Sequence, residues 1–362
     1  MPSRARFPSL NRVIARLSRS QRRHLHDFEW PLQKIKPLSL LFSQRHRHAG
    51  VDRMFFQFEE LPVFGKEYWF LYVSDAKTLN HLVVMFGRAQ GTVNINRRRL
   101  KESHAASPKT EIPLVCEYWS YSGKKKRSKG FQSVFSVRNS PENALEDRSK
   151  RVSLTGKYPF YSFSIRENGQ RIASISFSAP RSGKPYEIGH FSTSVFGFEL
   201  VNVFPTFKGT LYGKPVSGHG YLQKVVAVGP FIPWNWARIH FPDGSILDVF
   251  SLRFVPSHSF GSISPSRSTF WDARTGRQRT LSGTSISRDA DRSSWVIRDG
   301  KGRLLLHLYP KAKHRFLFKS TGEFLYDQYA VDAYPEEGGI ALAGRTLKKG
   351  AGLLEDAYGF ML

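Results

Sequence analysis

Apolar and polar side chains alternate at every second position along most of the chain beyond about residue 54. This is the period of a β-strand whose two faces meet different surroundings. The alternation is clearest over residues 160–177, where the Asn168-Gly169 pair between two alternating runs suits a tight hairpin turn. Helical periodicity is nearly absent outside the first 50 residues. Periodicity alone therefore predicts an all-β protein.

Residues 234–250 predict the hairpin around which the rest of the chain is organised. Asp243-Gly244 supplies two residues that tolerate a positive φ, as a type I′ turn requires. With these two residues at the tip, Ile239 lies opposite Asp248.

The two faces of this predicted hairpin differ in chemistry, because successive side chains point to opposite sides of a strand. One face carries an aromatic and basic row, formed by Trp234, Trp236, Arg238 and His240. The other face is mainly apolar and includes Ala237, Ile239 and Asp248. Large side chains on both faces favour a sheet that is covered on each side, as in a barrel that holds a ligand or packs against a neighbour.

Length and composition set broad limits. The chain has 362 residues, of which 40% are hydrophobic and 14% aromatic, enough for a buried core and for two domains. The single cysteine, Cys116, excludes an intrachain disulfide. The formal net charge of +26 has three explanations: nucleic acid, an anionic membrane surface, or charge that serves solubility alone.

Residues 1–50 form a basic extension with eleven Lys and Arg side chains against Asp27 and Glu29. Residues 10–17 have helical spacing, which predicts an amphipathic helix at a membrane surface; a transit-like segment and a poorly ordered terminus are the alternatives. The two His-x-His pairs, His24 with His26 and His46 with His48, stand among arginines and do not predict a metal site.

No apolar run reaches the ~20 residues of a spanning helix. We therefore predict a cytoplasmic protein, either free or peripheral to a membrane.

Three motifs resemble one family. They are Gly220-Tyr221 followed by Trp234-x-Trp236-x-Arg238 and Asp243-Gly244; Glu67-Tyr68-Trp69-Phe70; and Gly352 to Gly359 near the end. In order and spacing these are similar to the carotenoid 1,2-hydratase (hydroxyneurosporene synthase) family and its lipocalin-like relatives, some of which are cyclases of polyketide-derived substrates. The resemblance covers roughly residues 54–362.

The resemblance implies two consecutive lipocalin-like antiparallel β-barrel or half-barrel domains with an apolar pocket. We expect the basic extension at 1–50, one domain at 51–198 and a second at 199–362. Family hydratases usually carry Asp-His where this chain has Gln223-Lys224. An acid that protonates an alkene is therefore missing from that position, and the resemblance supports the fold better than the hydration reaction.

Candidate site residues follow from the hairpin and the motifs. The catalytic candidates are Asp248, His240 and Tyr221, and the ligand-binding candidates are Trp234, Trp236, Arg238, Tyr68, Trp69 and Tyr358. Asp248 leads because a carboxylic acid on an apolar face can stay protonated and donate a proton; a buried ion pair is the alternative. Arg238 is expected to stack on an indole, either as a pocket wall or as a barrel plug. Glu67 and Glu355 are further acidic candidates.

No cofactor is expected, since no Gly-rich phosphate loop follows a strand and opens a helix. We expect a protein that binds an apolar isoprenoid- or lipid-like molecule, with or without acid-assisted hydration, cyclisation or isomerisation. The alternatives are a non-enzymatic carrier of the same fold and a basic β-barrel that binds nucleic acid or another polyanion.

Overall fold

The computed structural model describes residues 50–61, 65–75, 80–91, 93–100, 110–139, 142–179, 186–192, 197–229, 233–253, 266–289, 291, 293–320 and 322–360. Strands dominate these residues, so the predicted all-β fold is confirmed. The segment 1–49, with its predicted helix and four histidines, lies outside the described residues. In the described part of the chain, no helix has the length and apolar character needed to cross a bilayer.

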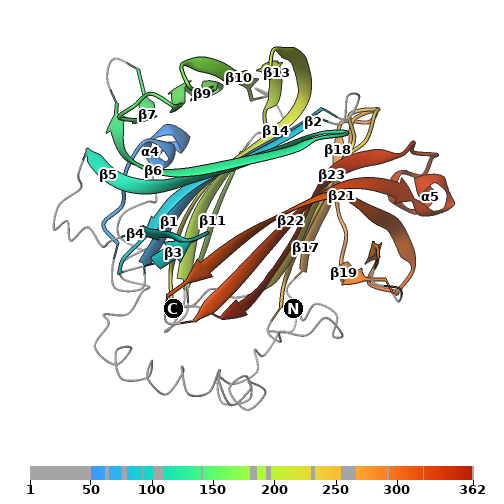
Figure 1. Cartoon of the computed structure of the whole chain (residues 1–362). Helices are drawn as coiled ribbons and strands as arrows, with labels where there is room; N and C mark the ends of the chain where they lie inside the picture. Colours follow the sequence, from blue (N-terminus) through green and yellow to red (C-terminus); the bar gives the residue numbers. More distant parts are fainter. Residues whose placement is uncertain are drawn as a thin grey trace.

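The first sheet closes on itself (Figure 1). Ten of its strands form an antiparallel ring, because β1 pairs with β2 on one side and with β14 on the other. Strands β12 and β11 extend the sheet from β14. The strands are β1 (Gly65–Asp75), β2 (Asn80–Ala89), β5 (Glu111–Ser122), β6 (Lys126–Arg138), β7 (Ala144–Asp147), β8 (Val152–Lys157), β9 (Phe160–Glu167), β10 (Gln170–Ser178), β11 (Tyr186–Ser192), β12 (Gly197–Val203), β13 (Thr206–Leu211) and β14 (Lys214–Val228).

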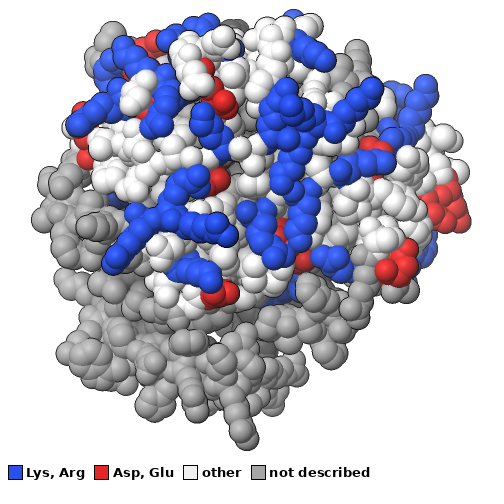
Figure 2. All heavy atoms as spheres, in the orientation of Figure 1, with Lys and Arg blue, Asp and Glu red and all other residues white. Residues whose placement is uncertain are grey.

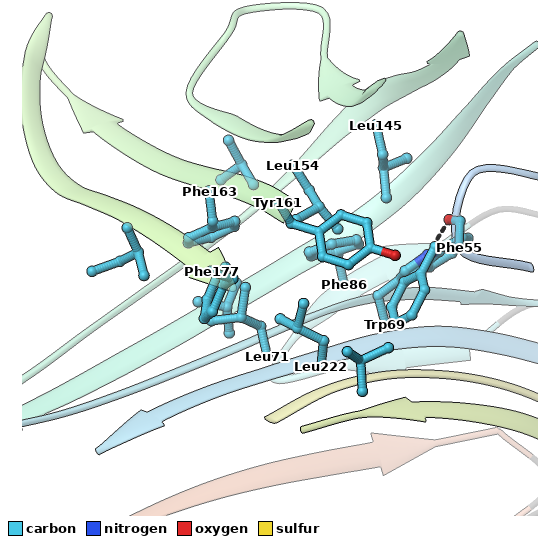
Figure 3. Close-up of a cluster of buried hydrophobic side chains, with 14 of the residues drawn as sticks. Phe55, Trp69, Leu71, Phe86, Leu145, Leu154, Tyr161, Phe163, Phe177 and Leu222 are labelled. Carbon is cyan, nitrogen blue, oxygen red and sulfur yellow. Dashed lines mark hydrogen bonds between the residues drawn. The ribbon is translucent and has the colours of Figure 1, made fainter. Parts of the chain in front are cut away.

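Alternate side chains of these strands form the core of the barrel (Figure 3). The indole of Trp69 on β1 stacks on Phe86 of β2, with ring centroids 5.6 Å apart. Helix α4 (Val51–Phe55) joins this core, since the Phe55 carbonyl accepts a 2.9 Å hydrogen bond from Trp69 Nε1. The hydroxyl of Tyr161 on β9 donates to Asp52 of the same helix at 2.8 Å. The helix is thus tied to both sides of the ring.

The second sheet is an eleven-stranded antiparallel array in the described residues. It curves so that β19 also contacts β15 and β16. Its strands are β15 (Trp234–His240), β16 (Ile246–Leu252), β17 (Ser266–Asp272), β18 (Arg277–Thr280), β19 (Ser285–Arg288), β20 (Trp295–Arg298), β21 (Leu304–Lys319), β22 (Glu323–Pro335) and β23 (Gly350–Phe360), joined by β3 (Val93–Ile95) and β4 (Arg98–Leu100). The 3-10 helix η1 (Glu336–Gly339) and helix α5 (Ile340–Ala343) connect β22 to β23.

The two sheets share chain segments. The hairpin β3–β4 comes from between two barrel strands, yet β3 pairs with β21 of the second sheet. Residues 199–228, which the sequence assigned to the second domain, pair with barrel strands through β12, β13 and β14. Sheets are not the same as independently folding units, so the domain division at residue 198 stays a prediction.

The hairpin predicted around Asn168-Gly169 is present. Glu167 pairs with Gln170, which leaves the two predicted residues at the tip. Both have a positive φ, 48° and 79°, as a type I′ turn requires.

The register predicted for the central hairpin is wrong by one residue. Asp248 lies opposite Arg238 rather than Ile239. The cause is Pro242: a two-residue turn at Asp243-Gly244 needs an N–H from residue 242, and proline has none. The hydrogen bond runs instead from the Phe241 N–H to the Ser245 carbonyl at 2.9 Å, which lengthens the loop by one residue.

This slip moves Asp248 to the other face of the sheet, because side chains alternate with a period of two. Asp248 therefore shares a face with Trp236 and Arg238, while Ala237 and Ile239 point into the core of the second sheet.

Replacing Phe86 by alanine should lower the free energy of unfolding by about 3–5 kcal/mol, because the ring is 1% exposed and its loss leaves a cavity beside Trp69. The matched variant Phe160→Ala removes a ring that is 54% exposed and should change it by less than about 0.5 kcal/mol. Urea unfolding measures both values. Equal losses in the two variants would contradict the assignment of the barrel core.

Candidate functional site

The outer wall of the barrel packs against one face of the second sheet. The strands that meet are β1, β2, β5 and β14 of the barrel and β15, β21, β22 and β23 of the second sheet. Figure 1 shows β21 and β22 running beside the barrel strands. The contact is rich in aromatic side chains, among them Phe70 of β1, whose ring lies 6.0 Å from Trp236. We call this region the inter-sheet contact.

The alternation of β1 explains the composition of this contact. Trp69 and Leu71 point into the barrel core, whereas Phe70 and Tyr72 point outward to the second sheet. A strand segment that is buried on both faces carries large, mainly apolar side chains at successive positions, as β1 does over residues 68–73.

Arg238 and Asp248 form an ion pair inside the inter-sheet contact. Arg238 is 3% exposed, and its guanidinium donates to Asp248 Oδ2 at 2.6 Å. The other carboxylate oxygen accepts from Trp236 Nε1 at 3.1 Å. Trp236, Arg238 and Asp248, three of the predicted site residues, are thus brought together, and the ion-pair alternative for Asp248 is the observed one.

The rings beside Arg238 are not the predicted indole. Its guanidinium carbon lies 5.0 Å from the ring centroid of Phe204 and 5.3 Å from that of Tyr221. Trp236 is engaged with Asp248 and lies beside Tyr221, with 5.1 Å between their rings. The prediction placed the cation correctly among aromatic rings and named the wrong ring.

Tyr221 also belongs to a small polar cluster. Its hydroxyl donates to Asn202 Oδ1 at 2.9 Å, and Gln223 Nε2 donates to the Tyr221 oxygen at 2.8 Å. Burial raises the pKa of Tyr221 well above its usual value. The Tyr221 hydroxyl therefore keeps its proton near pH 7 and takes part in the site as an uncharged hydrogen-bonding group.

Glu355 of β23 is the carboxyl group with the most unusual surroundings in the inter-sheet contact. It is 5% exposed and accepts hydrogen bonds from Trp234 Nε1 at 3.0 Å and from Gln328 Nε2 at 3.1 Å. The hydroxyl of Tyr326 donates to it as well.

The protonated and charged forms of Glu355 are both populated near neutral pH. Burial raises its pKa to about 7, although its three hydrogen-bond donors favour the charged form; nearby Asp248 adds to the rise. A carboxyl group with such a pKa can donate or accept a proton at neutral pH. The carboxyl group whose pKa is raised to about 7 in the inter-sheet contact thus lies on the closing strand, and sequence reasoning named Glu355 only as a further candidate.

The predicted residues of the entry motif point to different places. Tyr68 lies on the outward face of β1, and burial together with the charge of Glu355 raises its pKa. Trp69 points into the barrel core instead, where Lys224 Nζ lies 4.8 Å above its ring. The structure brings Tyr68 close to Glu355 and places Trp69 on the opposite side of the barrel wall.

His240 lies at the centre of a histidine cluster in the inter-sheet contact. Its ring stacks on Tyr72 at 5.9 Å and lies 5.5 Å from His219, while Tyr72 OH and His81 Nδ1 are 3.1 Å apart. Burial lowers the pKa of His81 and His219 to about 4 and that of His240 well below its usual value. These imidazoles are therefore neutral at neutral pH. Neither ring nitrogen of His240 has a hydrogen-bond partner among the described residues.

The Gln223-Lys224 pair faces two ways. Gln223 points into the inter-sheet contact, where its amide joins Asn202 and Tyr221. Lys224 points into the barrel, where its ammonium group pairs with the buried Glu67 at 2.9 Å. The position that carries an acid in the resembled family thus presents an amide here.

Tyr358 is not brought together with the other predicted residues. It lies on the opposite face of the second sheet, where its hydroxyl accepts a 2.8 Å hydrogen bond from Arg315.

Sequence reasoning missed Tyr326 and Gln328, the β22 residues that bind Glu355. A signal was present, since Phe324, Tyr326 and Gln328 alternate along one strand and place a polar group on an otherwise aromatic row. Gln328 also accepts a 2.7 Å hydrogen bond from Trp119 of the barrel, which links the two sheets. For a metal ion, no group of three or more His, Cys, Asp or Glu residues in the described ranges is suitably placed.

No protein-family model matches the chain, and no curated protein matches it by sequence. Among solved structures, the chain is similar to a protein provisionally designated AttH from Nitrosomonas europaea, at 13% identity and a TM-score of 0.46 over 80% of this chain and 92% of the other. It is also similar to CghA with Sch210972, at 10% identity and 0.45 over 82% and 88%, and to CghA alone, at 10% identity and 0.46 over 81% and 87%. The closed antiparallel barrel itself rests on the strand pairing described above.

The free energy of unfolding should depend on pH through Glu355. Its carboxyl pKa is about 7 when folded and 4.5 as the reference value for the unfolded chain. The stabilisation is therefore fully present below pH 4.5 and is lost as the pH rises to 7. At about 1.4 kcal/mol per pH unit, this amounts to roughly 3 kcal/mol.

Urea unfolding of the wild type and Glu355→Gln between pH 4.5 and 8 measures this term as the difference between the two curves. The control Glu323→Gln replaces an exposed carboxyl on the adjacent strand and should leave the pH dependence unchanged. A difference between wild type and Glu355→Gln that is constant over this range would contradict the assigned pKa.

Proposed function

We propose that the protein binds an apolar isoprenoid- or lipid-like molecule at the inter-sheet contact and that Glu355 acts on it as a general acid. The reaction class is hydration, cyclisation or isomerisation, as the resemblance to the carotenoid hydratase family implies. The observation that carries the proposal is the buried carboxyl of Glu355, with a pKa of about 7, beside aromatic rings of both sheets.

The chemistry of such a reaction fits these surroundings. Protonation of an alkene leaves a carbocation, which an aromatic face stabilises through its quadrupole. The rings of Trp234 and Tyr326, with centroids 5.3 Å apart, border the Glu355 carboxyl, and Phe324 lies 5.5 Å from Trp234 and extends this aromatic row. Exclusion of bulk water keeps the proton donor neutral and protects the cation from early capture. The Glu355 carboxylate regains its proton from the single water that adds to the cation in a hydration, or from a carbon beside the cation in a cyclisation or isomerisation.

Asp248 is the second candidate acid in this proposal. Both of its oxygens are engaged, by Trp236 and by Arg238, and its side chain is 23% exposed against 5% for the whole of Glu355. An acid that serves as the partner of a buried guanidinium cannot be protonated without leaving that cation unpaired. We therefore assign proton transfer to Glu355 and the positioning of Arg238 to Asp248.

A carrier of the same fold is the other candidate. It is favoured by Gln223, which presents an amide where the resembled family has an acid. In this case Glu355 would only hydrogen-bond to the ligand, and the ligand would leave chemically unchanged.

We propose that the basic surface of the protein contacts an anionic membrane. Figure 2 shows Lys and Arg side chains spread over the face in view. Residues 124–127 are exposed at the start of β6, and Lys126 reaches the Lys313 carbonyl on β21, so basic residues of the two sheets adjoin. Nucleic-acid binding is less favoured, because base stacking needs exposed aromatic rings and most rings of the barrel are buried.

Incubation of the protein with isoprenoid lipids, followed by mass spectrometry of the bound and released species, tests the function. Glu355→Gln should lower turnover by roughly 10²–10⁴-fold while ligand binding persists, since general acid catalysis contributes that much. Asp248→Asn should impair ligand binding and turnover together, because it leaves Arg238 without its carboxylate.

The exposed variant Glu323→Gln should behave as the wild type. Unchanged ligand recovered from every variant would favour the carrier, and recovery of no apolar ligand at all would overturn the proposal. Loss of turnover in Asp248→Asn with full activity in Glu355→Gln would reverse the two assigned roles.

A further inference from the structure

A polar row crosses the face of the second sheet that points away from the barrel. The register places Arg315 opposite Asp327, Asp327 opposite Asp356, and Asp356 opposite Asn235 on four adjacent strands. Directly opposite residues share a face, so these four side chains lie in one line. Further along the same face the side chains are apolar and form the core of the second sheet.

Asp327 is shared by two cations. Arg315 donates to its two oxygens at 2.6 and 2.8 Å, and Lys313 Nζ lies 2.7 Å from Oδ2. Although burial alone would raise it, hydrogen bonds from Arg315 and Lys313 hold the pKa of Asp327 below its usual value. The carboxylate is therefore charged, and a single negative charge faces two positive ones.

Asp356 is likewise shared by two cations. Arg253 donates to its Oδ1, and Arg288 lies 3.6 Å from Oδ2. Arg253 and Asp356 are both buried, so they form a compact pair, whereas Arg288 is held more loosely.

Tyr329 joins the two halves of the row. Its hydroxyl accepts a 3.1 Å hydrogen bond from Arg288 and lies 3.5 Å from Asp327 Oδ2. Lys313 Nζ lies 5.2 Å from its ring centroid. Arg288 and Lys313 therefore contact Tyr329 directly, and Arg315 lies beside it through the shared carboxylate of Asp327.

The charges of this network do not balance. Among the described residues, four cations, Arg253, Arg288, Lys313 and Arg315, face two carboxylates, those of Asp327 and Asp356, which leaves two positive charges in excess. Since the compact Arg253–Asp356 pair is neutral, the excess lies at the three cations around Tyr329. Lys313 and Arg315, with side chains 42% and 45% exposed, connect this end to solvent.

We propose that Arg288, Lys313 and Arg315 form a binding site for a phosphate dianion. A dianion offsets the two excess charges, and guanidinium groups bind phosphate through paired N–H donors. The contacts to Asp327 and Tyr358 use three of the five N–H donors of Arg315, and the contact to Asp327 uses one of the three of Lys313. The Nε of Arg288 is buried and has no hydrogen-bond partner among the described residues.

This site is separate from the inter-sheet contact. Asp356 and Glu355 are neighbours on β23, and their side chains point to opposite faces of the same sheet. The phosphate site therefore goes beyond the proposed function and does not depend on it.

Isothermal titration calorimetry with inorganic phosphate, at constant ionic strength set by chloride, tests the site on the full chain. The wild type should bind one phosphate per chain, and Arg315→Gln should weaken the affinity about tenfold or more through loss of a charge-assisted contact. The matched control Arg303→Gln removes an exposed arginine that pairs with Asp299 on the β20–β21 turn, and it should bind as the wild type does.

Lys313→Gln keeps the two Arg315–Asp327 hydrogen bonds and should weaken binding similarly, which provides a second variant if Arg315→Gln does not fold.

Vesicles that contain phosphatidic acid identify the source of the phosphate. A lipid headgroup is indicated if vesicle binding falls in the same variants, and a free phosphate compound if only the calorimetric affinity falls. No phosphate binding by the wild type, or equal weakening in Arg315→Gln and Arg303→Gln, would overturn the site.

Discussion

The packing of the barrel wall against the second sheet is the constraint on which the described site depends. A barrel strand normally turns one face to the core and the other to water. In this protein β1 and β14 have no wetted face at the inter-sheet contact, because β15, β22 and β23 cover them. An unpaired charge on the covered face would therefore cost several kcal/mol, and a neutral polar group without a partner would cost less. This requirement that charge be paired or absent explains the Arg238–Asp248 ion pair and the neutral imidazole of His240, whose ring nitrogens have no hydrogen-bond partner among the described residues.

Two carboxyl groups meet this requirement in different ways. Asp248 is balanced by a guanidinium, whereas Glu355 is bordered by neutral donors, a tyrosine, an indole and an amide. Neutral donors satisfy the oxygens without supplying positive charge, so burial dominates and the pKa rises. Different surroundings of two neighbouring acids are the usual basis for dividing roles in acid–base chemistry. The opposite face of the same sheet shows the reverse balance, with more cations than carboxylates.

Much of the fold was readable from local sequence. The period of two identified the strands, and Asn168-Gly169 located a hairpin with the observed turn. The central hairpin was readable as well, but only with Pro242 included, since its missing N–H excludes the two-residue turn. Because the prediction left out the effect of Pro242, it placed Asp248 on the wrong face of the sheet. The sequence predicted correctly that the acidic candidates lie on strands. It did not predict the charges and hydrogen-bond donors around each acid, because these belong to strands that are far apart in the chain.

The sequence by itself determined an all-β chain, the aromatic row from Trp234 to His240, and the presence of few acids among many bases. The tertiary structure alone decided which acid is buried among neutral donors. Glu355 is 27 residues from Gln328 and 121 from Trp234, and strand pairing brings all three together. The tertiary structure also decided that β3 joins the second sheet and that Tyr358 faces away from Trp236. Alternation is a local property of the backbone, whereas solvent exclusion depends on which sheet faces meet, and no local pattern records that choice.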